Sequence, residues 1–193
     1  MPAGNQINIK RGRVEEITLL KAWCNWATRG RRQYLKAILK LPSDERVKAR
    51  GASFESIQDI FLHIIEDYNW WFHDVVNDRQ REFEELVGKE WGDADLRRLS
   101  RLVDRWVGSL TDSLTPESLS HEYLVNGRGG DGKPYTMTVS LADIMWHMLE
   151  EELQHRGELN ALFWQMDIDP PVDSWFGEEL RKLKHERPPY PAR

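Results

Sequence analysis

Three polar residues lie at helical spacing in one segment of the chain: His147, Glu151 and His155. An α-helix turns by about 100° per residue, so residues four apart follow one another along one face. Apolar residues such as Met145 and Leu149 surround this face, which is therefore predicted to point inward. Buried imidazole and carboxylate groups need a partner. A divalent metal ion is one such partner, because His nitrogens and Glu oxygens are common metal ligands in proteins.

A metal site also needs a ligand from a second element, and His63 supplies one. It lies inside the apolar run that extends from Ile57 to Trp71. Catalytic zinc commonly has three protein ligands and keeps its fourth position for water or substrate. His63, Glu151 and His155 form such a set. Two histidines and one carboxylate also suit iron or nickel, so the ligand types do not identify the ion.

Simpler interpretations of these residues remain open. His63 on an apolar face is also typical of a core histidine that is hydrogen-bonded to a neighbour. Glu150, Glu151 and Glu152 also fit a solvated acidic run, in which His155 pairs with one carboxylate. On spacing alone, the metal site and a metal-free hydrogen-bonded network are both consistent with the sequence.

Other chemistries have less support. Glu152 and His155 have the Glu-x-x-His spacing of di-iron carboxylate bundles, but the second Glu-x-x-His that such a site requires is absent. The chain has no Gly-x-Ser-x-Gly motif, which argues against a serine hydrolase. His73 and His121 are predicted to lie at the surface, and His185 lies near the end of the chain.

Composition is typical of an ordinary globular protein. The 193 residues are 40% apolar and 31% charged, and the net charge of −5 argues against nucleic-acid binding. Cys24 is the only cysteine, so no intramolecular disulfide can form. The sequence shows no signal peptide and no apolar stretch of about 20 residues that would span a membrane. We expect a single cytoplasmic domain covering residues 1–193.

Apolar residues at three-four spacing predict four long helices and an all-α fold, a four-helix bundle. Their ranges are residues 14–41, a segment from 53 or 56 to 77, 93–110 and 140–166. Gly30 is expected to weaken the first helix. Residues 122–125 and 135–139 flank a glycine-rich turn and predict a short hairpin before the last helix. A short amphipathic piece, 175–184, precedes a flexible Pro-rich tail at 185–193.

Several tryptophans fall inside these helical patterns and are predicted to be core or interface anchors, because aromatic side chains bury large areas. They are Trp26, Trp70, Trp71, Trp146 and Trp164.

Three segments resemble the DinB/YfiT-like metalloenzyme superfamily. Asn25-Trp26-Ala27 resembles the Trp-Ala element of its first helix, and residues 56–64 resemble its second-helix motif, which ends at a metal-binding histidine. Residues 146–159 resemble its last helix, with a His-x-x-x-His-Arg-Gly motif in which Glu151 replaces the first histidine. Pro170-Pro171 follows, as in the family. The resemblance extends over nearly the whole chain.

This resemblance implies a four-helix bundle with up-down-down-up connection and one divalent ion, zinc or nickel. The ligands would be His63, Glu151 and His155, with His147 as an alternative ligand or a neighbouring packing residue. Glu151 lowers the positive charge of the site relative to three neutral histidines, which makes a bound water less acidic.

The activity implied by the resemblance is that of a thiol S-transferase, which uses bacillithiol, mycothiol or a related small thiol as cosubstrate. Some similar proteins are maleylpyruvate isomerases. Arg156 would hold a carboxylate of the thiol, or else bond to Glu152, and Gly157 would permit close helix packing.

We expect a homodimer that binds a small molecule and that binds neither nucleic acid nor a membrane. The alternative is a non-enzymatic, dimeric helical bundle for binding or stress response.

Overall fold

The computed structural model describes residues 3–77, 86–128 and 131–171, and the side chains from residue 13 onward within these ranges. The expectations for residues 175–184, 185–193 and His185 lie outside the described part. The elements, in chain order, are α1 Ala3–Ile38, α2 Ser43–Val47, α3 Ile57–Tyr68, the π-helix η1 Asn69–Val75, α4 Asp93–Asp112, α5 Pro116–Leu119, β1 Glu122–Arg128, β2 Pro134–Ser140 and α6 Leu141–Gln165.

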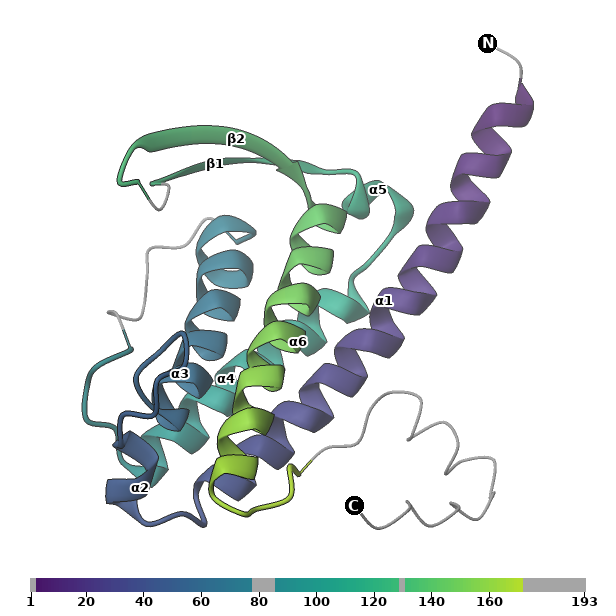
Figure 1. The fold of residues 1–193 in the computed structure, drawn as a ribbon. Helices are drawn as coiled ribbons and strands as arrows, with labels where there is room; N and C mark the ends of the chain where they lie inside the picture. The colour runs from purple at the N-terminus through teal and green to yellow at the C-terminus, as the bar shows by residue number, and fades with distance from the viewer. Residues whose placement is uncertain (1–2, 78–85, 129–130, 172–193) are drawn as a thin grey trace, which may run out of the picture.

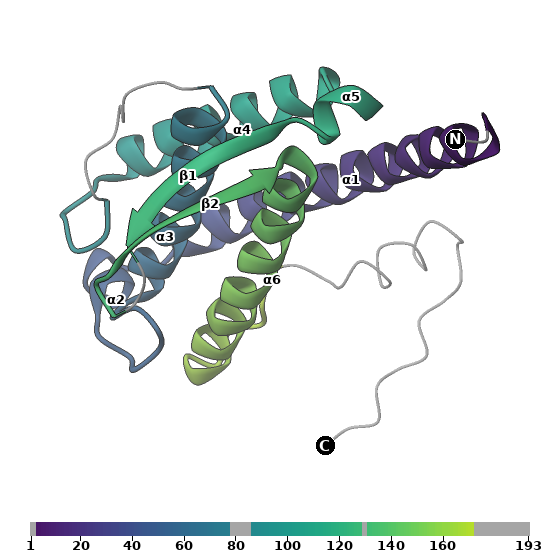
Figure 2. The same ribbon diagram turned by 90° about the horizontal axis from the view of Figure 1, so that it is seen from above.

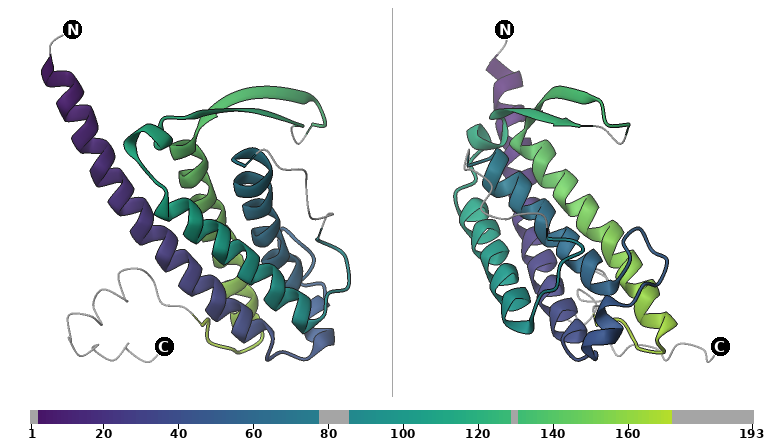
Figure 3. Two further views of the ribbon diagram at one scale, coloured as in Figure 1. Left: turned by 180° about the vertical axis from the view of Figure 1, so that it is seen from behind. Right: turned by 90° about the vertical axis from the view of Figure 1, so that its left-hand side faces the viewer.

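The four long helices α1, α3, α4 and α6 form the predicted bundle. α1 and α6 run in one direction, whereas α3 and α4 run in the other, which is the expected up-down-down-up order (Figures 1 and 3). α3 packs against α6, and α1 packs against both α4 and α6. No described helix combines the length and the apolar character that crossing a membrane would require.

Side-chain caps set the starts of the two helices that matter for the site. The Ser140 hydroxyl accepts from the backbone N–H of Asp143, and the Asp143 carboxylate accepts from the Ser140 N–H in return. This capping box starts α6 at the predicted position. Ser56 caps α3 by accepting from the Asp59 N–H at 3.1 Å, so Ser56 rather than Ser53 begins that helix. The caps fix the residues at which α3 and α6 begin.

The predicted hairpin is present. β1 and β2 pair antiparallel, with Glu122 opposite Ser140 and Arg128 opposite Pro134. The hairpin leads directly into α6 and extends across the end of the bundle from which that helix starts (Figure 2). Val125 is its one fully buried residue among those described, which anchors the hairpin to the helices.

Two helical predictions need correction. α1 begins at Ala3 rather than at residue 14, because the segment before Val14 has no proline after Pro2 to stop it, and it extends beyond the bundle (Figure 1). The second helix changes to π geometry at Asn69. The wider π turn alters which residues face the bundle. His73 is consequently 1% exposed, with its ring 5.0 Å from that of Trp106, so its predicted surface position was wrong.

The tryptophans divide into two groups. Trp26 and Trp71 are buried as predicted, and Trp70 is partly buried. Trp146 and Trp164 are 37% and 62% exposed, so neither is a core residue. Both project from the side of α6 that faces away from the core, where only an interface role would be consistent with the prediction.

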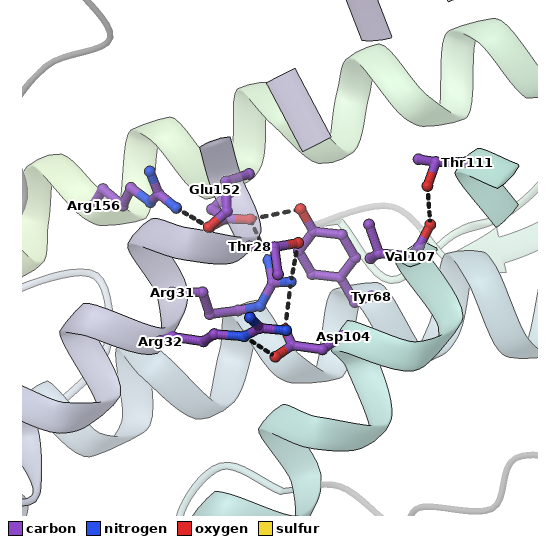
Figure 4. Close-up of polar contacts among 10 residues, drawn as sticks. Thr28, Arg31, Arg32, Tyr68, Asp104, Val107, Thr111, Glu152 and Arg156 are labelled. Carbon is purple, nitrogen blue, oxygen red and sulfur yellow. Dashed lines mark hydrogen bonds and ion pairs between the residues drawn. The ribbon is translucent and has the colours of Figure 1, made fainter. Parts of the chain in front are cut away.

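A buried charge network joins all four long helices (Figure 4). Glu152 on α6 accepts from Arg31 of α1 at 2.6 Å, from Tyr68 of α3 and from Arg156 one turn later. Arg31 also reaches Asp104 of α4 at 3.2 Å. Burial by itself would raise the pKa of Glu152, but the charges of Arg156 and Arg31, with the Tyr68 hydrogen bond, hold it below its usual value. Glu152 is therefore a buried carboxylate and not part of a solvated acidic run.

Gly30 has a packing role within this network. A Cβ at Gly30 would overlap the guanidinium of Arg156, which also donates to the carbonyl of Ala27. The absence of a side chain on α1 thus makes room for the arginine of α6. Gly157 is the opposite case, because it is exposed and a Cβ there would meet no described atom within 4 Å. The expected close packing at Gly157 does not occur within the described chain.

The two glycines form a matched pair for testing this packing. Glycine to alanine inside a helix normally stabilises a protein by roughly 0.5–1 kcal/mol. Gly157→Ala should show this gain in urea unfolding. Gly30→Ala should instead lower the free energy of unfolding by about 1–3 kcal/mol, because overpacking displaces the arginine. Equal stabilisation of both variants would contradict the packing role of Gly30.

Candidate metal centre

The candidate centre lies between two antiparallel helices, α3 and α6, and we call its residues the metal triad: His63, Glu151 and His155. One ligand atom from each of the three lies within 4.8 Å of the other two. His155 Nε2 is 3.3 Å from Glu151 Oε2, and His63 Nε2 is 4.0 Å from the same oxygen. Two ligands bound to a tetrahedral ion at about 2.1 Å lie about 3.4 Å apart. Small side-chain rotations would bring the triad to that spacing, so its residues fit a metal ion.

The two imidazole rings are held by their neighbours. Their centroids are 4.5 Å apart with the planes at 82°, and the ring of Phe54 stacks on His63 at 4.3 Å. Phe54 belongs to the segment that precedes α3. It covers one face of His63 with an apolar ring, which shields that part of the centre from water.

His155 divides its two nitrogens between different partners. Its Nδ1 lies 3.2 Å from Glu158 Oε2, while Nε2 faces Glu151. The Ser53 hydroxyl donates to the same oxygen of Glu158 and so links this carboxylate to the segment before α3. A carboxylate on the outer nitrogen fixes the orientation of a ligating histidine. His155 therefore presents Nε2 to the centre.

His63 has a different environment. Its Nε2 lies 3.1 Å from Asp67 Oδ2 as well as 4.0 Å from Glu151. Burial alone would lower the pKa of His63, but the hydrogen bond and charge of Asp67, followed by the charge of Glu151, raise it above its usual value. The nitrogen that faces the triad is thus surrounded by carboxylates, which favour a positively charged partner.

The centre is buried on one side and open on the other. His155 is 4% exposed, whereas His63 and Glu151 are partly exposed. A cavity of about 310 Å³ adjoins the triad at His63 and is lined further by Glu66, Asp67 and Trp70. This arrangement leaves access for a small molecule beside His63.

The other two predicted site residues have separate positions. His147 is partly exposed, its Nε2 lies 3.9 Å from Glu151 Oε1, and its ring stands against Trp71. His147 thus lies near Oε1 of Glu151, whereas His63 and His155 lie near Oε2. Arg156 lies in the buried network and bonds to Glu152, the alternative that the sequence left open, and it does not line the cavity (Figure 4).

Three neighbours of the triad were not identified from the sequence. Asp67 follows His63 by four residues and Glu158 follows His155 by three, so helical spacing contained the signal for both. Phe54 lies outside the helices, and no periodic pattern connects it to His63. Its contact depends on the path of the chain between α2 and α3.

Comparison with known proteins agrees with this architecture. The model of the DinB family matches residues 17–179, which is most of the chain. This protein belongs to the DinB family. Among solved structures, a DinB-like protein from Bacillus cereus ATCC 10987 has 15% identity and a TM-score of 0.57, over 80% of this chain and 95% of its own. A DinB-like protein from Bacillus subtilis has 15% identity and a TM-score of 0.51, over 88% and 96% of the two chains. No curated protein matches the chain.

These similarities extend the sequence resemblance to the three-dimensional fold. At 15% identity, the two solved structures support the shared DinB bundle and do not define an activity. Any activity of this DinB-family protein must be argued from its own triad and cavity.

Proposed function

We propose that this DinB-family protein is an enzyme that depends on one divalent metal ion and transfers a low-molecular-weight thiol to a small electrophile. The observation that carries the proposal is the metal triad, in which three ligand atoms from two facing helices converge within 4.8 Å beside an accessible cavity. His63, Glu151 and His155 would hold the ion. Zinc or nickel suits two imidazoles and a carboxylate.

The chemistry follows from a three-ligand site. An ion with an open position binds a thiolate and lowers the pKa of the thiol, which produces a nucleophile at neutral pH. The role of the protein is positioning: Glu158 orients His155, and Phe54 covers one face of His63. The cavity beside His63 has room for a small substrate.

Arg156 has no part in this proposal. Its guanidinium is buried against Glu152 and lies over the rings of Trp26 and Tyr34. Moving it to a substrate carboxylate would leave Glu152 with one cation fewer in a buried position, which is costly. Recognition of the thiol is therefore assigned to groups at the cavity.

Metal content tests the ligand set. The purified protein, equilibrated with zinc or nickel, should retain about one ion per chain. His63→Ala and His155→Ala should each lose it, because two ligands hold an ion poorly, whereas His121→Ala, at an exposed histidine, should retain it. Elemental analysis after gel filtration measures the content. Stoichiometric metal in both triad variants would contradict the proposal.

Thiol transfer tests the catalytic part. Conjugation of several small thiols to a chromogenic electrophile should require the metal-loaded protein. Glu151→Ala should lower kcat/KM by about 100-fold or more, since metal assistance contributes several kcal/mol to the transition state. A rate that is the same before and after chelation, for every thiol tested, would refute a metal-dependent transferase.

A second candidate is a non-enzymatic bundle that associates through α6. Trp146, Leu153, Gly157 and Trp164 are all exposed and lie within about 40° of one another around this helix. Such a stripe suits an isologous contact with a second copy of the chain. In this case the triad would be a metal-free polar network. A melting temperature that chelation leaves unchanged favours this candidate, and a large fall favours the metalloenzyme.

A further inference from the structure

The two histidines of the triad use their nitrogens differently. His155 contacts Glu158 through Nδ1 and Glu151 through Nε2, which are opposite sides of its ring. His63 contacts both Asp67 and Glu151 through the same atom, Nε2. Glu158 thus occupies an outer position, behind the ring of its histidine. Asp67 occupies an inner position, on the side of His63 that faces the triad.

The sequence spacing places Asp67 as the counterpart of Glu151. Each of the two helices carries one histidine and one carboxylate four residues apart: His63 and Asp67 on α3, and Glu151 and His155 on α6. Because α3 and α6 run in opposite directions, the two histidines lie at one level and the two carboxylates at the next. The 4.5 Å separation of the two imidazole centroids agrees with this pairing.

Metal binding would change the environment of Asp67. An imidazole nitrogen that coordinates a metal carries no proton, so Nε2 of His63 can no longer donate a hydrogen bond to the carboxylate. The observed 3.1 Å between this nitrogen and Asp67 Oδ2 also matches adjacent ligands on one ion, which are about 3.0–3.4 Å apart at metal distances near 2.1 Å. The same carboxylate that partners His63 lies beside the triad but outside the group whose ligand atoms already converge within 4.8 Å, so its side chain must rotate toward the other two residues to bind the ion.

We propose that Asp67 is a fourth protein ligand of the centre, which then has two histidines and two carboxylates. The proposal rests on the metal site proposed above and adds a ligand to it. With neutral imidazoles, the two carboxylates balance the charge of a divalent ion. Balance matters here because the set is largely buried, and an unbalanced buried charge is unfavourable. Substrate then takes a fifth position, which zinc accepts by expanding its coordination.

Zinc affinity of matched variants tests the role of Asp67, without any activity assay. Asp67→Asn removes the charge and the strong ligand but keeps the shape of the side chain. Glu150→Gln is the control, because it removes one negative charge at an exposed position beside Glu151. Competition with a chromogenic chelator gives each dissociation constant, with circular dichroism to show that both variants are folded. A crystal structure of the zinc-loaded wild type locates the Asp67 carboxylate.

We expect Asp67→Asn to weaken zinc binding by more than about 100-fold, beyond the 10–100-fold effect of outer-shell partners. Glu150→Gln should change it by less than about fivefold. The zinc-loaded structure should show an Asp67 oxygen about 2.0–2.2 Å from the ion. If wild type binds zinc but the two variants have equal affinity, or if Asp67 lies more than about 3 Å from zinc, Asp67 is not a ligand. If wild type binds neither zinc nor nickel, the metal site itself is refuted.

Discussion

One buried carboxylate, that of Glu152, determines how the last helix sits in the bundle. It lies between Arg31 of α1 and Arg156 of its own helix and accepts a further hydrogen bond from Tyr68 of α3. Arg31 continues the network to α4 through Asp104. Removing one member of such a set leaves an uncompensated charge in the core, so the network strongly penalises any rotation of α6 about its axis. Gly30 completes the arrangement by leaving space for Arg156.

The candidate metal centre depends on this orientation. Glu152 faces the core. Measured around the axis of α6 from Glu152, Glu151 lies about 100° away and His155 about 60° away in the same direction, on the side of the helix that meets α3. There they meet His63, and each histidine has a carboxylate of its own: Glu158 for His155 and Asp67 for His63. Adjacent residues of α6 thus have separate tasks. Glu152 joins the helices, and Glu151 belongs to the site.

The sequence predicted those features that depend on local chemistry or regular spacing. The capping box at Ser140 and the hairpin are of this kind. The convergence of His63 with Glu151 and His155 was implied by the family resemblance, because His63 lies on a different helix from the other two residues. The burial of His73 was missed because a π turn breaks the α period on which the prediction relied. A bond between Arg156 and Glu152 was one of the predicted alternatives. Arg31 could not be predicted as a partner of Glu152, because it is 121 residues away and only the packing of α1 on α6 brings the two together. The inward position of Glu152 could have been predicted from helical spacing, because Glu152 shares a helical face with Met145 and Leu159.

Equilibrium urea unfolding of Glu152→Gln, with and without zinc, tests most directly whether the buried network supports the site. Glu150→Gln is the comparison, because Glu150 lies on the same helix two residues before Glu152 but is exposed. We predict that Glu152→Gln lowers the free energy of unfolding by about 3–5 kcal/mol and reduces the additional stabilisation by zinc. The exposed variant should stay within about 0.5 kcal/mol of wild type. If both variants have the same stability and the same response to zinc, the network does not position the metal centre.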